Sequence, residues 1–229
     1  MSRLARNLSA NFLSNAWSTV LALLLTPLYV SWLGMESYAL IGFYASWVAI
    51  LGILDTGISA TTMRQMAWMS ARPEEQGTVP SFLRTVETMY WAIVAIIGCA
   101  MVVWSWGWGA SLFESRTLSP SAVRDALVLM SLSLVIQVPS GLYLAGLLGL
   151  QRQVLSSALT AGFGTLRAAG AVAVLALIAP DIRWFFCWQI LTSILQTAVT
   201  RQALWQAIKP RDLARFSMPL LPTRQRSRG

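Results

Sequence analysis

Long apolar stretches with almost no charged residues constrain this chain more than any other feature of its sequence. Two examples are YWAIVAIIGCAMVVW at residues 90–104 and AAGAVAVLALIAP at residues 168–180. The hydrocarbon core of a bilayer is about 30 Å thick, and about 20 apolar helical residues are needed to cross it. Strands of a membrane barrel would be about ten residues long and would alternate in polarity. The sequence therefore predicts an all-α integral membrane protein.

The composition agrees with this prediction. The chain has 229 residues, of which 56% are hydrophobic and only 11% are charged, and its mean hydropathy is +0.60. An ordinary soluble domain has about 25% charged residues. In a membrane protein, the formal charge of +8 reports on topology before it reports on nucleic acid, and we expect no nucleic acid partner.

The apolar stretches divide into six predicted spans, at about residues 10–33, 37–57, 85–107, 123–149, 154–179 and 183–206. We expect them to form one six-helix bundle over residues 1–207, followed by a basic cytoplasmic tail, 208–229, that is disordered or truncated. Pro139-Ser140-Gly141 interrupts the fourth span. Because proline has no backbone N–H, we expect a bend at this point.

The distribution of basic residues predicts the orientation of these spans. Thirteen of the 17 Lys and Arg residues lie on the side of the N-terminus, three lie on the other side, and Arg167 lies within a span. Cytoplasmic loops of membrane proteins carry the excess of Lys and Arg. We therefore expect a multi-pass protein of the bacterial inner membrane with both termini in the cytoplasm.

The residues that most often carry chemistry are scarce. The chain has no histidine, and its two cysteines, Cys99 and Cys187, lie in separate apolar stretches without metal-ligand spacing. We interpret both cysteines as small buried hydrophobic residues. No nucleophile and base form a recognisable pair, so we expect no enzyme, no metal site and no cofactor.

The triplet Asp55-Thr56-Gly57 matches the signature of aspartic proteases, but its context does not. Those enzymes need two aspartates that share a proton. The other aspartates, Asp125, Asp181 and Asp212, are not followed by Thr-Gly or Ser-Gly. Asp55 instead ends a predicted membrane span. It either pairs with Arg64 or Arg84 at the helix end, or it faces an aqueous cavity.

Four predicted spans carry polar residues along one helical face, at about 100° per residue. The faces consist of Asn7, Asn11, Asn15 and Ser18; of Ser133, Gln137 and Ser140; of Ser157, Thr160, Gly164 and Arg167; and of Gln189, Ser193, Gln196 and Thr200. In lipid, such a face must point at protein or at water. We therefore predict a shared hydrated cavity lined by Arg167, Asn11, Asn15, Gln137, Gln189, Gln196 and Asp55.

Arg167 is the most informative single residue, because it lies midway along its predicted span. A charge at that depth is a functional hypothesis by default. Two interpretations are open. Arg167 contacts an anionic substrate, or it is structural and either pairs with Asp55 or Glu87 or extends toward the cytoplasm.

Two segments resemble bacterial O-antigen and exopolysaccharide flippases. The first, residues 11–67, contains an Asn/Ser-rich helix, TPLY at 26–29 and LDTGIS at 54–59 followed by an arginine. The second, residues 143–175, contains the turn GLQRQ before a helix with an internal arginine. These flippases belong to the multidrug, oligosaccharidyl-lipid and polysaccharide exporter superfamily.

The resemblance implies a two-lobed, MATE-like transporter in which each lobe is a six-helix bundle. It implies that the cargo is a lipid-linked oligosaccharide, moved across the inner membrane for surface polysaccharide biosynthesis. This chain matches only the N-terminal half, which implies a half-length or truncated member. The alternatives are a drug or cation antiporter of the same superfamily, and an inactive membrane remnant or scaffold.

A single lobe creates a problem for the polar stripes. Alone in lipid, it would leave them facing hydrocarbon, where each stranded polar group costs several kcal/mol. We therefore expect the lobe to be unstable, to turn its stripes inward, or to pair with a second lobe. That second lobe would be a separate chain or another copy, and membrane lipids would surround both.

The predicted topology can be tested with fusions to a phosphatase that is active only in the periplasm. We expect activity for a fusion after Gly109 and none for a fusion after Ala207, because the excess of Lys and Arg keeps the second site inside. The reverse pattern of activity would contradict the predicted orientation.

Overall fold

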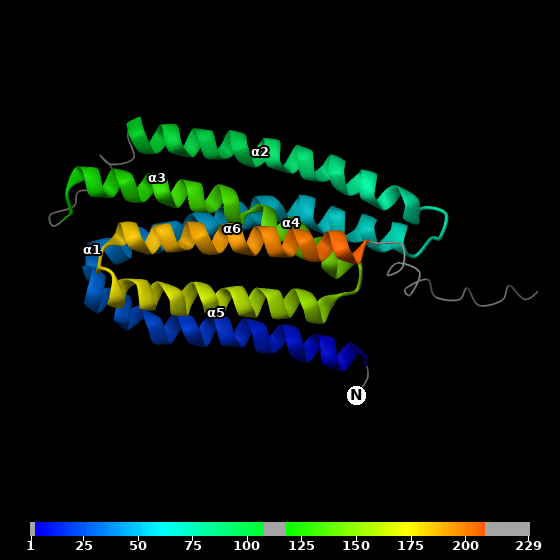
Figure 1. Cartoon of the computed structure of the whole chain (residues 1–229), viewed down its shortest axis with the longest axis horizontal. Coiled ribbons are helices and arrows are strands. Elements are labelled where there is room, and N and C mark those ends of the chain that lie inside the picture. The colour runs from blue at the N-terminus through cyan, green and yellow to red at the C-terminus, as the bar shows by residue number, and fades with distance from the viewer. Residues whose placement is uncertain (1–2, 108–117, 209–229) are drawn as a thin grey trace, which may run out of the picture.

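The computed structural model describes residues 3–107 and 118–208, and these residues are helical throughout apart from short turns (Figure 1). The helices are α1 (Arg3–Ser70), α2 (Val79–Gly107), α3 (Pro120–Gln137), α4 (Pro139–Gly149), α5 (Gln153–Leu177) and α6 (Ile182–Ala207), with a short 3-10 turn at Gln76–Thr78. The side chains of residues 3–11, 13–15, 18 and 22 lie outside the described part, as does the predicted tail from residue 209 on.

The long element α1 consists of two helices joined at Gly34, where the backbone leaves the helical region with φ 79° and ψ 166°. The Thr26 Oγ1 and Tyr38 hydroxyl oxygens are 3.3 Å apart. In one straight helix, these two residues would be about 18 Å apart along the axis. The chain therefore reverses direction at Gly34. Figure 1 shows that the two halves of α1 run in opposite directions along the bundle.

α6 lies in the middle of the bundle, with α3 on one side and α5 on the other (Figure 1). α2 packs on the far side of α3, and the first half of α1 packs along α5. The second half of α1 packs against α4. Two apolar clusters fill the two ends of the bundle, one around Leu127 and Phe186 and the other around Met66 and Leu204.

Four described stretches are long and apolar enough to cross a membrane: Thr19–Ser70, Gln76–Gly107, Pro120–Gly149 and Gln153–Leu177. The first of them contains both helices of α1, and the third contains α3 and α4. α6 is not among the four. The structure thus confirms an all-helical protein with several helices of membrane-spanning length.

In the middle of α6, between Gln189 and Thr200, polar residues are buried and apolar residues are exposed. Its buried side chains include Gln189, Thr192, Ser193, Thr197 and Thr200. Its exposed side chains include Leu191, Ile194, Leu195 and Val199. Ser133 and Ser140, of the neighbouring α3 and α4, are buried as well. Ser133, Ser140, Gln189, Ser193 and Thr200, from the polar stripes predicted on these helices, thus lie inside the bundle.

The helices extend beyond the predicted spans. The predicted span 37–57 belongs to a helix that continues to Ser70, and the predicted span 85–107 belongs to a helix that begins at Val79. Hydropathy marks the part of a helix inside the bilayer, whereas the helix itself continues while its side chains find packing. Met66 and Leu83, both fully buried, pack within one cluster at this end.

The two cysteines are not buried as predicted. Cys99 and Cys187 are both free thiols with exposed side chains on the outer faces of α2 and α6. Cysteine is a small apolar residue that needs no polar partner. It is therefore compatible with a surface that faces lipid, and burial cannot be deduced from its residue type.

The reversal at Gly34 gives a test of the fold. Replacing Gly34 with alanine should destabilise the protein by about 1–3 kcal/mol, because its φ and ψ lie in a region that is essentially restricted to glycine. Gly42 is the matched control, because an added Cβ meets nothing within 4 Å at either position and φ is positive only at Gly34. Unfolding in detergent should separate the two variants. Equal stabilities would contradict this account of the turn.

Candidate polar site within the helix bundle

Arg167, on α5, is held by uncharged side chains of α6. Its Nη2 donates to Gln196 Oε1 at 2.8 Å and lies 3.4 Å from Ser193 Oγ. Arg167 forms no ion pair within the described part of the chain, and Glu87 pairs with Arg201 instead. The structural alternative that pairs Arg167 with Asp55 or Glu87 is therefore wrong.

Hydrogen bonds continue from Arg167 across the bundle to α3 and α1. The hydroxyl groups of Ser193 and Ser133 are 3.5 Å apart, and that of Ser133 is 3.3 Å from the Tyr44 hydroxyl. Tyr44 then donates to Gln137 Oε1 at 2.7 Å. We call this series from Gln196 through Arg167 to Gln137 the polar track. It connects four helices: α1, α3, α5 and α6.

The backbone beside Arg167 is also fixed. The Trp188 indole N–H donates to the Arg167 carbonyl at 3.2 Å, and the Tyr29 hydroxyl donates to the Ala168 carbonyl at 3.2 Å. Gly170 lies so close to the Trp188 ring that a Cβ there would overlap it. α5 is therefore held from both sides at the level of Arg167, so the guanidinium is presented from a rigid helix.

Asp55 lies in the second half of α1 and accepts hydrogen bonds on both carboxylate oxygens. Ser59 Oγ donates to Oδ2 at 2.8 Å, and the Tyr90 hydroxyl, from α2, donates to Oδ1. Neither Arg64 nor Arg84 forms an ion pair with Asp55. The carboxylate in the triplet Asp55-Thr56-Gly57 is therefore hydrogen-bonded to hydroxyl groups. The interpretation in which Asp55 pairs with Arg64 or Arg84 is wrong.

The carboxylate of Asp55 lies against the start of α4. A Cβ added to Gly141 would lie 2.8 Å from Asp55 Oδ2. α4 begins at Pro139, directly after α3 ends at Gln137, which confirms the expected interruption. The backbone is helical at Val138, and the Gly141 N–H donates to the Val138 carbonyl at 3.1 Å. The carboxylate therefore packs against the backbone of the α3–α4 junction at Gly141.

A cavity of about 160 Å³ opens beside Asp55. Its walls come from α1, α3, the Val138 junction and α4, and include Val48, Leu51, Gly52, Asp55, Leu134, Gln137, Val138, Ser140 and Gly141. Gln137 therefore belongs both to this cavity and to the polar track. It connects Asp55 with Arg167, so four of the predicted site residues, Arg167, Gln196, Gln137 and Asp55, lie along one connected path.

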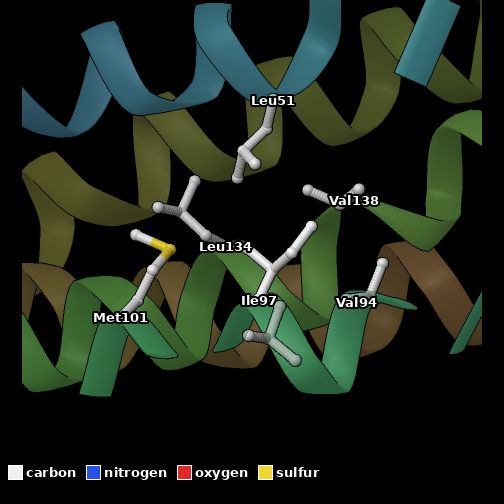
Figure 2. A pocket seen from close by; sticks show the side chains of 7 residues that line it. Leu51, Val94, Ile97, Met101, Leu134 and Val138 are labelled. Atoms are coloured by element: carbon white, nitrogen blue, oxygen red, sulfur yellow. The ribbon is translucent and has the colours of Figure 1, made fainter. Parts of the chain in front are cut away.

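An apolar pocket of about 20 Å³ lies next to this cavity (Figure 2). Leu51, Leu134 and Val138 line both spaces. In Figure 2, Leu51 from α1 and Met101 from α2 point toward this pocket from opposite sides. Apolar walls of this kind exclude water, so these three shared side chains form a dry boundary on one side of the Asp55 cavity.

A second polar cluster lies between α2, α4 and α6. The Glu87 carboxylate accepts from the Tyr143 hydroxyl at 2.6 Å and forms an ion pair with Arg201. The Trp91 indole N–H lies 3.2 Å from the Tyr143 oxygen. This cluster ties three helices together close to the end of the bundle that contains Arg84 and Arg201.

The remaining predicted residues differ in their placement. Gln189 is 4% exposed, and its Oε1 accepts no hydrogen bond from the described residues. On α5, Thr160 is exposed and its hydroxyl donates to the Ser156 carbonyl, so it does not join the track. Asn11 and Asn15 have backbones in α1, but their side chains lie outside the described residues.

Sequence reasoning missed Tyr44 and Tyr90, although each provides a central hydroxyl. A tyrosine in an apolar span looks like a large hydrophobic residue, and only its partner shows that the hydroxyl is used. The available signal was that a buried tyrosine hydroxyl normally needs a hydrogen-bond partner.

No protein-family model matches the chain, and no curated protein or solved structure matches it significantly.

The contact between Asp55 and Gly141 can be tested by two substitutions in one cavity. Gly141→Ala should lower the free energy of unfolding by about 1–3 kcal/mol, because the carboxylate must move and give up a charge-assisted hydrogen bond. Gly52→Ala should have little effect, because a Cβ there meets nothing within 4 Å. In an Asp55→Ala background, the cost of Gly141→Ala should disappear. If Gly141→Ala still destabilises the protein in the Asp55→Ala background, the destabilisation does not come from the contact with Asp55.

Proposed function

We propose that this chain is a six-span lobe of a bacterial inner-membrane exporter that moves lipid-linked oligosaccharide for surface polysaccharide biosynthesis. The observation that carries the proposal is Arg167, a half-buried arginine held by Gln196 and Ser193 with no acidic partner among the described residues. Such a cation within a membrane bundle needs an anion or water. The sequence resemblance to polysaccharide flippases supplies the class of cargo.

The inverted polarity of α6 supports the count of six spans. Its outer face is apolar at Leu191, Ile194, Leu195 and Val199. Its mean hydropathy is low because it contains several polar residues, and Gln189, Thr192, Ser193, Thr197 and Thr200 among them are buried. A helix of 26 residues is about 39 Å long, which is enough to cross the hydrocarbon core. Together with both halves of α1, the α3–α4 pair, α2 and α5, it completes six.

The distribution of arginines between the two ends of the bundle supports the proposed orientation. Arg72 and Arg152 lie at or beside the turns that follow α1 and α4, and Arg84 lies near the start of α2. Arg124 and Arg183 lie at the opposite end, where Arg183 is neutralised by Asp125. We therefore assign the end with more arginines to the cytoplasm.

The geometry of Arg167 suits a phosphate better than it suits a structural ion pair. Gln196 and Ser193 fix Nη2, while the guanidinium has three further N–H donors. Arginine binds phosphate oxygens through two parallel hydrogen bonds, and a preoriented guanidinium loses less conformational entropy on binding. We therefore assign to Arg167 a contact with the diphosphate or with acidic sugars of the carrier lipid.

The proposal includes a second lobe, either a separate chain or another copy of this one, since alternating access requires two bundles that move around a shared site. Ser133, Ser140, Gln189, Ser193 and Thr200 are buried within the bundle, although Gln189 Oε1 accepts no hydrogen bond from the described residues. The half-buried Arg167 is the residue that a facing lobe would complete.

A drug or cation antiporter of the same superfamily is the second candidate. It is favoured by one observation, the unpaired carboxylate of Asp55 at a cavity. An organic cation would be repelled by Arg167, so the two candidates predict opposite effects of neutralising this residue. An inactive remnant or scaffold would bind neither cargo.

Binding of a radiolabelled polyprenyl diphosphate-linked oligosaccharide to the full chain in lipid nanodiscs tests the proposal. We expect Arg167→Ala to weaken binding about tenfold or more, which corresponds to the loss of one charge-assisted hydrogen bond. Arg167→Lys should recover binding only in part, because lysine is a point charge without the planar fork.

The matched control is Arg124→Ala, which removes an arginine that lies over the Trp106 ring, away from the polar track. It should leave the affinity unchanged. The proposal fails if the wild-type chain does not bind the carrier, or if Arg167→Ala binds it as tightly as the wild type does. Tighter binding of an organic cation by Arg167→Ala would instead favour the antiporter.

A further inference from the structure

A groove of about 270 Å³ lies between the second half of α1 and α2, and it shares no residue with the polar track. It is lined by Gly57, Ile58, Thr61 and Thr62 of α1 and by Phe82, Val86, Met89, Tyr90 and Ile93 of α2. Thr61, Met89 and Ile93 are exposed, so the groove opens on the outer surface of the bundle. We call it the α1–α2 groove. In a membrane, such a surface meets lipid chains or another protein.

The α1–α2 groove leaves almost no polar group for an occupant to bind. The Thr61 hydroxyl donates to the Gly57 carbonyl at 2.8 Å, and the Tyr90 hydroxyl donates to Asp55, which does not line the groove. Thr62 is 2% exposed, and the other side chains along the groove are apolar. Buried water needs roughly two to four polar partners. The groove therefore suits a hydrocarbon chain.

The groove is long and runs parallel to the helix axes. Phe82 and Ile93, at its two ends on α2, are 11 positions apart in the sequence, which corresponds to about 16 Å along the helix. The second half of α1 runs alongside in the opposite direction, because a short turn at Gln76–Thr78 joins the two helices (Figure 1). A linear chain that lies along the helices therefore fits this groove better than a compact ring system.

The end of the groove nearest this turn is basic. At about 100° per residue, Arg64 and Trp68 lie on the same face of α1 as Gly57 and Thr61. Arg64 is exposed, and the Arg72 guanidinium lies 3.9 Å from the centre of the Trp68 ring. Tryptophan is typical of the level of the lipid headgroups. Two cations thus lie just beyond the apolar walls, where a headgroup would be.

Both arginines are available to an anion. Although Glu74 and Glu75 follow Arg72 in the turn, neither Arg64 nor Arg72 forms an ion pair within the described part of the chain. At the opposite end of the groove, the exposed side chains of both helices are apolar: Ile53, Leu54 and Ile96. The surface is therefore basic at one end and apolar along the rest, which matches the polarity of an anionic phospholipid.

We infer that the α1–α2 groove binds one anionic glycerophospholipid of the surrounding bilayer. An acyl chain lies along Phe82, Val86 and Met89, and the phosphate contacts Arg64 and Arg72. Arginine binds phosphate oxygens through two parallel hydrogen bonds. A zwitterionic headgroup carries its own cation beside the phosphate, whereas an anionic headgroup keeps its net charge for the two arginines.

A second copy of the chain is a poorer occupant of this surface. Copies in one membrane insert with the same orientation, so the basic ends of two facing grooves would lie at the same depth. Arg64 and Arg72 of each copy would then approach those of the other, and like charges that face each other are unfavourable. A phospholipid instead neutralises them.

This inference does not depend on the cargo that the chain carries. It concerns a surface on α1 and α2, whereas the proposed function depends on Arg167 of α5. Arg167→Ala should therefore leave phospholipid binding unchanged, and the variants of the groove test no part of the carrier site. The failure of one proposal leaves the other intact.

Native mass spectrometry of the full chain in detergent tests the headgroup. Dioleoylphosphatidylglycerol and dioleoylphosphatidylcholine, which have the same acyl chains, are added at equal concentrations. We expect the chain to retain one phosphatidylglycerol and to bind it about fivefold more tightly, or better, than phosphatidylcholine, as one arginine near an anionic headgroup provides. Replacing Arg64 and Arg72 together with glutamine should abolish this preference.

The matched control for the headgroup is Arg124→Gln. Arg124 also lies over a tryptophan ring, that of Trp106, but at the other end of the bundle. It should retain the full preference for phosphatidylglycerol. Loss of the preference in this variant as well would show that net charge alone decides the binding, which contradicts a site at the α1–α2 groove.

The acyl chain is tested by filling the groove. Gly57→Leu should weaken the binding of both lipids about tenfold, because its side chain displaces about two methylene groups from the apolar walls. The matched control is Gly42→Leu. Both glycines are exposed in the second half of α1, and an added Cβ meets nothing within 4 Å at either position. The two variants therefore gain the same helix propensity.

Four results would overturn the inference. The first is equal affinity of the wild-type chain for the two phospholipids. The second is binding by Gly57→Leu that is as tight as binding by Gly42→Leu. The third is displacement of phosphatidylglycerol by an equal concentration of a polyprenyl diphosphate lipid, which would identify the occupant as the carrier. The fourth is a dimer that Gly57→Leu dissociates, which would identify the occupant as a second copy.

Discussion

The long apolar helices, four stretches of which could cross a membrane, are the constraint on which the rest of this structure depends. In hydrocarbon, a polar group has no partner except another protein group, so each stranded group costs several kcal/mol. α6 buries Gln189, Ser193 and Thr200 and exposes Leu191, Ile194 and Val199. Along the middle of this helix, between Gln189 and Thr200, polar residues are buried and apolar residues are exposed, and hydrogen bonds between helices involve the buried ones.

The hydrogen bonds of the polar track are individually weak but collectively decide the arrangement of the bundle. Interhelical hydrogen bonds in membrane proteins average about 0.6 kcal/mol each. The contacts from Gln196 through Arg167, Ser193, Ser133 and Tyr44 to Gln137 fix how four helices are rotated about their axes. A rotation of any one helix would break its contact and expose a polar group to lipid.

The interruption at Pro139 connects this track to Asp55. Gln137 is the last residue of α3, and the side chain of Gln137 lines the Asp55 cavity. The Asp55 carboxylate lies against Gly141, near the start of α4. A carboxylate, an amide and a glycine thus come together at this interruption, where Asp55, Gln137 and Gly141 line one cavity.

The sequence by itself predicted helices that are long and apolar enough to span a membrane and the interruption at Pro139, because hydropathy and proline act locally along the chain. It also indicated that Gln137, Arg167 and Gln196 share an interior, since helical periodicity places each on a polar face. It did not determine where helices end beyond the bilayer, whether Cys99 and Cys187 face inward, or which partners Arg167 and Asp55 have. Only the tertiary structure decided these, because helix rotation and the choice of neighbour depend on contacts between residues far apart in sequence, such as Tyr90 with Asp55 and Tyr44 with Gln137.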